Sequence, residues 1–288
     1  MKNAALLRSQ GLRAKKSFGQ NFLEDRAALE RIAALCDVGP GHRHVVEIGA
    51  GLGALTAALA ERGAHVFAME RDRDLAPLLR ARFSGRDDVE ILEANALVMD
   101  LRVLADKHGP LTVCGNLPYH LTSPLVFRAL DQLDAWRRLV VMVQREVADR
   151  MVAGPGSRTY GLLSVMLQAR LRVQKALDVP PGAFHPPPKV HSAVVVMTPR
   201  ADPPVGAELP QYRALARAAF AGRRKTLRNG LKALLGDPAA LLERAGVDGG
   251  VRAETLDVKT FARLARCAAE LGLASSAPPP GEPDDDDA

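Results

Sequence analysis

Residues 44–53 read His-Val-Val-Glu-Ile-Gly-Ala-Gly-Leu-Gly, so a short apolar run passes directly into a turn with three glycines. The run has the length and the Val and Ile content of a buried strand, and the stretch from Leu52 to Arg62 has the composition of a helix. Glycines at such a junction let a ligand approach the backbone closely, because no Cβ stands in the way. The spacing is GxGxG, however, whereas dinucleotide-binding proteins have GxGxxG. The motif therefore predicts either a nucleotide site or an ordinary tight turn.

Apolar runs of strand length recur along the first half of the chain, at residues 65–70, 89–92, 111–115 and 139–144. The stretches between them have helical composition, at residues 74–83, 98–108 and 123–133. In the last of these, Ser123 predicts a helix cap, followed by Pro124 at the first helical position. Strands that alternate with helices predict right-handed βαβ crossovers and a mostly parallel sheet. We therefore expect an α/β, Rossmann-like fold.

The pattern changes after a further helical stretch at residues 146–153. Two strand-like runs, 170–179 and 192–198, flank a proline-rich loop, and strands joined so closely are expected to pair antiparallel. Beyond Pro203 the composition is helical, at residues 208–221, 225–235, 238–245 and 258–271. We expect a first domain over residues 1–204 and a small helical domain over residues 205–273. The acidic tail, residues 274–288, has nothing to bury and is expected to be disordered.

Composition and charge exclude several classes of protein. The 288 residues are 47% hydrophobic and 25% charged, as in an ordinary globular protein, which excludes a globally disordered or collagen-like chain. Neither a signal peptide nor a membrane-spanning run is evident, and this favours a soluble cytoplasmic protein. The three cysteines are far apart, so we expect reduced core thiols and no metal site. The net charge is +6 although the last eleven residues hold five acids, and this excess favours a polyanionic partner.

Polar residues follow the second and third strands of the predicted sheet. Glu70 ends the second strand, where a carboxylate can accept hydrogen bonds from both hydroxyls of a ribose. Asn95 follows the third strand, and its side-chain amide offers a donor and an acceptor to the edge of an adenine. Taken singly, Glu70 could be a solvated surface carboxylate and Asn95 a turn residue. Together with the glycine turn, they predict a pocket for an adenosine-containing cofactor at the carboxyl edge of the sheet.

The fourth strand is followed directly by Asn116-Leu-Pro-Tyr119. The exocyclic amine of a base is a poor nucleophile, because its lone pair is delocalised into the ring. Two oxygen acceptors, the Asn116 side chain and a backbone carbonyl, can hold the amine hydrogens so that the lone pair points at an electrophile. Pro118 restricts the turn, and Tyr119 offers a flat face on which an extruded base can stack. A polar β-turn is the alternative, but the position beside the predicted pocket favours catalysis by positioning.

Three further motifs add to this pattern: KSFGQNFL at residues 16–23, FHPPPKVHS at residues 184–192 and FAGRRKTLRN at residues 220–229. With the glycine turn and residues 116–119, they resemble the rRNA adenine N6,N6-dimethyltransferase family, most closely its bacterial small-subunit branch. The resemblance runs from Lys15 to about Leu271. It implies S-adenosylmethionine as the cofactor and dimethylation at N6 of two adjacent adenosines in the 3′-terminal hairpin of 16S rRNA. It also implies a class I methyltransferase sheet with one antiparallel strand, and an RNA-docking role for the helical domain.

The resemblance implies roles for individual residues. The cofactor-binding positions are Gln20, Asn21, Leu23, Gly49, Gly51, Glu70, Asn95 and Asn116. The family usually has Asp where this chain has Asn95, but an amide oxygen can still accept from an adenine amine. The catalytic positions are Asn116 and Tyr119, which match residues that orient and stack the target adenine, and Phe184, which matches an aromatic on its opposite face. Filling the core is the alternative for Phe184.

A basic run from Arg213 to Lys232 contains seven basic residues and no acid. On a helix, Arg217, Arg224 and Arg228 would share one face, where their mutual repulsion favours a bound phosphate. The resemblance implies docking of small-subunit rRNA, within a pre-ribosomal 30S particle, by Arg217, Arg223, Arg224, Lys225 and Arg228. We expect the protein to act as a monomer. A solvated basic face is the alternative.

Other functions stay open at this point. A nicotinamide-dependent oxidoreductase would use the glycine turn and Glu70 but would leave residues 116–119 unexplained. A ribosome assembly factor would need only the basic face. A relative that modifies large-subunit rRNA would share the motifs, although residues 220–229 resemble the small-subunit branch more closely.

Overall fold

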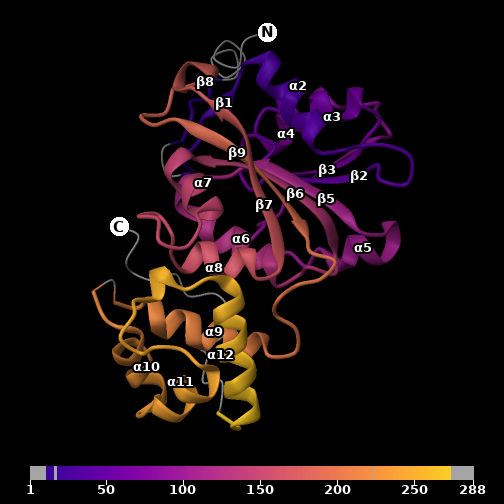
Figure 1. Ribbon diagram of the computed structural model, residues 1–288. Helices are drawn as coiled ribbons and strands as arrows, with labels where there is room; N and C mark the ends of the chain where they lie inside the picture. Colours follow the sequence, from indigo (N-terminus) through magenta and orange to yellow (C-terminus); the bar gives the residue numbers. More distant parts are fainter. Residues whose placement is uncertain (1–10, 16–17, 223, 274–288) are drawn as a thin grey trace. The chain divides into compact units, whose positions relative to one another are not determined.

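Figure 1 shows a computed structural model of the chain, which describes residues 11–15, 18–222 and 224–273. The contacts divide these residues into two compact units. The first unit holds residues 11–148 and 174–198, and the second holds residues 149–173 and 199–273. The expected boundary at residues 204 and 205 falls within the second unit, and the division into domains stays a prediction. The predicted disordered tail lies outside the described residues.

A seven-stranded sheet with the order β4-β3-β2-β5-β6-β9-β7 organises the fold. Its strands are β2 (His44–Ile48), β3 (His65–Met69), β4 (Val89–Leu92), β5 (Leu111–Asn116), β6 (Trp136–Gln144), β7 (Leu171–Val179) and β9 (Ser192–Pro199). Parallel pairing joins β4 to β3, β3 to β2, β2 to β5 and β5 to β6, and Figure 1 shows β3, β2, β5 and β6 side by side. The strand β9 runs antiparallel to β6, and β7 is its neighbour at the edge. The predicted mostly parallel sheet is confirmed.

Helices connect these strands in the alternation that the sequence predicts. They are α2 (Arg26–Leu35), α3 (Ala54–Glu61), α4 (Ala76–Arg82), α5 (Arg102–His108), α6 (Thr122–Leu130) and α7 (Arg145–Val152). The predicted cap at Ser123 is wrong, because the short 3₁₀ turn η2 (Tyr119–Leu121) runs directly into α6 and leaves Leu121 at the cap position. The helix α2 was not predicted, although Asp25 caps it by accepting a hydrogen bond from the Ala28 amide over 2.9 Å.

Valines of the central strands build the core of the first unit. Val45, Val46, Val66 and Val113 are each fully buried. Burying one such side chain stabilises the fold by about 1.5–3 kcal/mol. All three cysteines are free and buried, which confirms the prediction of core thiols. Burial of the valines fixes the strands in register, and the residues at the carboxyl ends of the strands are therefore held at one edge of the sheet.

The second unit is helical over most of its described length. Its helices are α8 (Leu162–Gln168), α9 (Leu209–Phe220), α10 (Leu227–Leu235), α11 (Ala239–Ala245) and α12 (Val258–Glu270). Aromatic rings pack between them: the Phe261 ring lies 6.3 Å from Tyr212 and 5.7 Å from Phe220, centroid to centroid. No described helix has the length and the apolar run that a membrane crossing requires.

The basic run does not form the single helical face that the sequence suggested. Arg217 lies on α9, Arg224 lies in the turn that follows, and Arg228 lies on α10. The chain leaves the first helix at Ala221, and Thr226 starts the next one by accepting a hydrogen bond from the Asn229 amide over 3.4 Å. The helical spacing between these arginines therefore does not apply.

Candidate functional site

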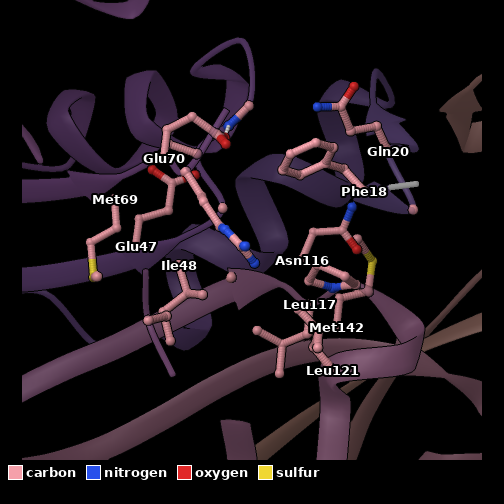
Figure 2. A pocket seen from close by; sticks show the side chains of 18 of the residues that line it. Phe18, Gln20, Glu47, Ile48, Met69, Glu70, Asn116, Leu117, Leu121 and Met142 are labelled. Atoms are coloured by element: carbon pink, nitrogen blue, oxygen red, sulfur yellow. Dashed lines mark hydrogen bonds between the residues drawn. The ribbon is translucent and has the colours of Figure 1, made fainter. Parts of the chain in front are cut away.

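A cavity of about 250 Å³ lies in the first unit, where β2, β3, β4 and β5 end. Because these strands are parallel, the residues that follow them meet at one edge of the sheet. The cavity is lined by every residue that the resemblance implied for cofactor binding: Gln20, Asn21, Leu23, Gly49, Gly51, Glu70, Asn95 and Asn116. Figure 2 shows Glu70 on one side of the view and Asn116 with Gln20 on the other. The fold thus brings the predicted residues together, and their individual roles stay predictions.

The glycine turn after β2 has a backbone that other residues rarely adopt. Gly49, Gly51 and Gly53 all have positive φ, at 73°, 58° and 78°. A Cβ on Gly53 would also lie only 2.5 Å from the Phe83 ring. The amides of Gly49 and Ala50 donate to the Met69 carbonyl, which ties the turn to the end of β3. The turn is therefore held rigidly against the strand that carries Glu70.

Glu70 is held by two backbone amides. Its Oε2 accepts from the Gly51 amide and its Oε1 accepts from the Asp72 amide, each over 2.8 Å. Only 7% of the residue is exposed, and burial raises the pKa of its carboxyl while the two amides act in the opposite direction. Each oxygen keeps a further lone pair for a ligand hydroxyl. Glu70 is therefore a fixed acceptor at the wall of the cavity.

Glu47 is a second carboxyl in the lining, and sequence reasoning did not assign it to the site. It is 2% exposed, its Oε2 accepts from the Thr56 hydroxyl over 2.5 Å, and burial raises its pKa to about 8. The signal that could have found it is a charged residue in the middle of an apolar strand, directly before the glycines. At neutral pH this carboxyl is mainly protonated, and a cation brought into the cavity would favour its ionised form.

Asn116, the last residue of β5, and Tyr119, in the turn that follows, line the same cavity. The Asn116 Nδ2 donates to the Asn21 carbonyl over 2.8 Å, so its Oδ1 is the atom left to accept from a ligand. The Tyr119 hydroxyl forms a 3.0 Å hydrogen bond with the Ser192 hydroxyl. Burial raises the pKa of Tyr119, so it stays a neutral phenol at physiological pH. The Tyr119 ring is thus held through its hydroxyl, beside the fixed side-chain amide of Asn116.

Asn95 fits both of the interpretations that the sequence left open. Its Oδ1 accepts from the Leu97 amide over 3.2 Å and its backbone carbonyl accepts from the Val98 amide, so it does organise a turn. It also lines the cavity, together with Leu97. The bond to Leu97 leaves the Asn95 Nδ2 and one lone pair of its Oδ1 for a ligand.

Phe184 differs from the other predicted residues. It is 5% exposed, it pairs with Leu23 in a small antiparallel sheet between β1 (Phe22–Leu23) and β8 (Phe184–His185), and it packs in the core with Leu29 and Ile32. It is not one of the cavity-lining residues. The alternative of an aromatic that fills the core therefore describes its place here, and direct contact with a target base stays a prediction.

The predicted RNA-binding residues belong to the second unit. Arg224, Lys225 and Arg228 are exposed, Arg217 is half-buried, and Arg223 lies outside the described residues. Three of these cations are thus exposed to solvent, and their role in RNA binding stays a prediction.

The sheet order, the antiparallel β9 and the cavity at the strand ends define a Rossmann-like class I methyltransferase fold. Residues 11–270 match the family model described as ribosomal RNA adenine dimethylase, and the chain belongs to this family of enzymes. The solved dimethyladenosine transferase from Plasmodium falciparum supports the fold, with a TM-score of 0.76 at 24% identity over 88% of this chain and 98% of that one.

Curated relatives place the chain more closely. A ribosomal RNA small subunit methyltransferase A from Geobacter sulfurreducens is 47% identical over 268 residues, which cover 90% of this chain and 97% of the relative. One from Anaeromyxobacter sp. strain K is 49% identical over 275 residues, or 91% and 96%. The solved 23S rRNA methyltransferase ErmE has a TM-score of 0.67 at 29% identity, over 86% of this chain and 99% of that one.

Proposed function

We propose that this chain methylates N6 of two adjacent adenosines in the 3′-terminal hairpin of small-subunit rRNA, with S-adenosylmethionine as the methyl donor. The observation that carries the proposal is the meeting of two groups in one cavity. The glycine turn follows β2, Glu70 follows β3, Asn116 is the last residue of β5, and Tyr119 lies in the turn after β5. The first group suits an adenosine-containing cofactor and the second suits a flat base with an exocyclic amine.

The lining residues fit S-adenosylmethionine by their chemistry. The fixed Glu70 carboxylate has free lone pairs for the ribose hydroxyls, and Asn95 can meet the edge of the adenine. The buried Glu47 carboxyl can compensate positive charge next to the glycine turn. When bound, the cofactor supplies an electrophilic methyl group on a sulfonium.

The chain's own part in the reaction is to position the target amine. The Asn116 Oδ1 and a backbone carbonyl of the turn accept the two amine hydrogens, which favours a nitrogen with a directed lone pair. Tyr119 stacks on the base face, and its hydroxyl is held by Ser192, so the ring is ordered before the base arrives. Neither residue needs to act as a strong base, because orientation supplies a large part of the rate.

The small-subunit target rests on the names of the relatives and on the basic segment. Both curated relatives named above are small subunit methyltransferases and extend over nearly the whole chain. Exposed Arg224, Lys225 and Arg228 offer phosphate contacts. We place the reaction on a pre-ribosomal 30S particle in the cytoplasm, with the enzyme as a monomer and Arg217 and Arg223 as further RNA contacts.

Large-subunit rRNA is the second candidate substrate, because the ErmE structure covers most of the chain at 29% identity. One experiment separates the two. The protein is incubated with labelled S-adenosylmethionine and with unmethylated small or large subunits, and the digested RNA is analysed for modified nucleosides. We expect label in N6,N6-dimethyladenosine from small subunits. Label in large-subunit RNA alone would support the second candidate, and RNA binding without any label would support an assembly factor.

A further inference from the structure

A network of hydrogen bonds holds the segment before α2, residues 18–23, which forms one wall of the cavity. The Lys15 amide donates to Gln20 Oε1 over 2.8 Å, and Gln20 Nε2 donates to Asp72 Oδ2 over 2.7 Å. The Lys15 ammonium donates to Asp72 Oδ1 over 2.6 Å and lies 2.7 Å from Asp74 Oδ2. Each end of the Gln20 amide is thus already bonded within the protein. We call Lys15, Gln20 and Asp72 the clamp.

The clamp joins two walls of the cavity that are far apart in the sequence. On one side, Asp72 donates its amide to Glu70, which in turn accepts from Gly51. On the other side, Gln20 precedes Asn21, whose carbonyl accepts from Asn116. A continuous path of short bonds therefore runs from the glycine turn to the turn that carries Asn116.

Asp72 is the centre of this path. Its side chain is 1% exposed, and although burial alone would raise its pKa, hydrogen bonds from Lys15, the Asp74 amide and Gln20 hold the pKa below the ordinary value. An ionised carboxylate that is so deeply buried is stabilised only by these partners. Its geometry is therefore coupled to that of Lys15 and Gln20.

We propose that Asp72 is a positioning residue for cofactor binding, which acts by clamping the segment from Phe18 to Leu23 as one wall of the cavity. Gln20 then belongs to the clamp, and its effect on the cofactor is indirect. Phe18 also lines the cavity and contacts the clamp. Its ring centroid lies 5.4 Å from the Lys15 ammonium and 6.0 Å from the Arg71 guanidinium. The inference rests on the proposed use of S-adenosylmethionine.

A reciprocal swap tests this clamp without changing its shape. Gln20→Glu sets a carboxylate oxygen against Asp72 Oδ2, and Asp72→Asn sets an amide NH₂ against the Gln20 NH₂. The double variant restores a donor and an acceptor, with their positions exchanged. In it, the amide oxygen at position 72 still accepts from the Lys15 ammonium, and a carboxylate oxygen at position 20 still accepts from the Lys15 amide. Asp134→Asn is the matched control, because Asp134 is an exposed partner of Arg102 and does not line the cavity.

Isothermal titration with S-adenosylmethionine and methyl-transfer kinetics give the readout. Loss of a buried, charge-assisted hydrogen bond should weaken cofactor binding about tenfold in each single variant and raise the cofactor KM to match, with kcat within about threefold. The double variant should recover most of the affinity, and the control should bind like the parent. Single variants that bind like the parent, or a double variant as weak as the two losses combined, would overturn the proposal.

Hydrogen exchange separates this proposal from the proposed function. The Lys15 amide donates to the Gln20 side chain and the Phe18 amide donates to the Lys15 carbonyl. Both amides should therefore exchange faster in Asp72→Asn than in the parent, with or without cofactor. A parent protein that binds no S-adenosylmethionine would refute the proposed function, and the exchange rates would still decide whether Asp72 holds the segment. Unchanged exchange in Asp72→Asn would refute the clamp itself.

Discussion

The Asn116 side-chain amide donates a 2.8 Å hydrogen bond to the Asn21 backbone carbonyl, across 95 positions of sequence. This bond ties the turn proposed to hold the target base to the wall proposed to hold the cofactor. One amide group thus has two functions: its nitrogen fixes the turn, and its oxygen is left to accept from a ligand. The arrangement explains why an asparagine suits this position better than a carboxylate, which has no hydrogen to donate.

Substitution of Asn116 should therefore affect turnover much more than cofactor binding. Asn116→Ala removes the acceptor for the target amine, and Asn116→Asp places a carboxylate against the Asn21 carbonyl. We expect kcat to fall about 100-fold or more in both variants, because positioned acceptors contribute at this scale. Cofactor affinity, measured by isothermal titration, should stay within about fivefold. A variant that keeps full turnover would refute the role of this amide.

Tyr119 should act through its ring and only weakly through its hydroxyl. Tyr119→Phe keeps the flat face and loses the hydrogen bond to Ser192, so single-turnover methyl transfer should stay within about threefold of the parent. Tyr119→Ala loses the stacking surface and should be about 100-fold slower, since stacking of one base contributes about 1–3 kcal/mol. Equal losses in the two variants would instead assign the effect to the hydroxyl.

Gly115 should be intolerant of any side chain. A Cβ at this position would lie 2.3 Å from the Ile48 carbonyl oxygen, which belongs to the paired strand β2. Gly115→Ala must push two central strands apart, and we expect a loss of about 2–4 kcal/mol in unfolding free energy by urea titration. Gly182→Ala is the matched control, because nothing lies within 4 Å of its Cβ position. If both variants unfold at the same urea concentration, the strand contact is not as close as described.

The sheet and the cavity were predictable from sequence for one physical reason. Apolar runs such as His44–Ile48 and Val89–Leu92 are short and bounded by turns, and the structure gives those same limits. Once the strands are parallel, their carboxyl ends must share an edge, and so Glu70, Asn95 and Asn116 had to be neighbours.

Contacts between distant segments were not predictable in this way. The pairing of Leu23 with Phe184 and the bond between Gln20 and Asp72 join segments that no local pattern relates. Phe184 accordingly lies in the core, and Gln20 has its amide bonded within the protein. The prediction of a single helical face of arginines was wrong for a local reason. One helix ends at Phe220 and the next begins at Leu227, so the arginines lie on separate elements.

Glu47 should make stability depend on pH. Its folded pKa is about 8, whereas an exposed glutamate titrates near 4.5, so the folded state holds a proton that the unfolded state has released. The stabilisation is complete below pH 4.5 and is lost as the pH rises toward 8, by about 1.4 kcal/mol per unit. Glu47→Gln should flatten this slope in urea titrations from about pH 5 to pH 8. The exposed substitution Glu90→Gln should leave it unchanged. A slope that survives in Glu47→Gln would assign it to another group.

The exposed cations of the second unit should govern RNA affinity. Charge reversal by Arg224→Glu with Lys225→Glu should weaken binding to small-subunit RNA and reduce its salt dependence by about two phosphate contacts, because each contact releases condensed counterions. Cofactor affinity should not change, since neither residue lines the cavity. Binding curves at several salt concentrations provide the measurement, and a slope equal to that of the parent would contradict the docking role.

The most direct measurement for the central claim is a structure of the protein with S-adenosylhomocysteine and an adenosine-containing RNA fragment of the small-subunit hairpin. We predict that the adenine ring stacks on Tyr119, that its N6 lies within hydrogen-bonding distance of the Asn116 Oδ1, and that the ribose hydroxyls of the cofactor product contact Glu70. An adenine bound away from the turn at residues 116–119, or a cofactor product bound away from Glu70, would contradict the account.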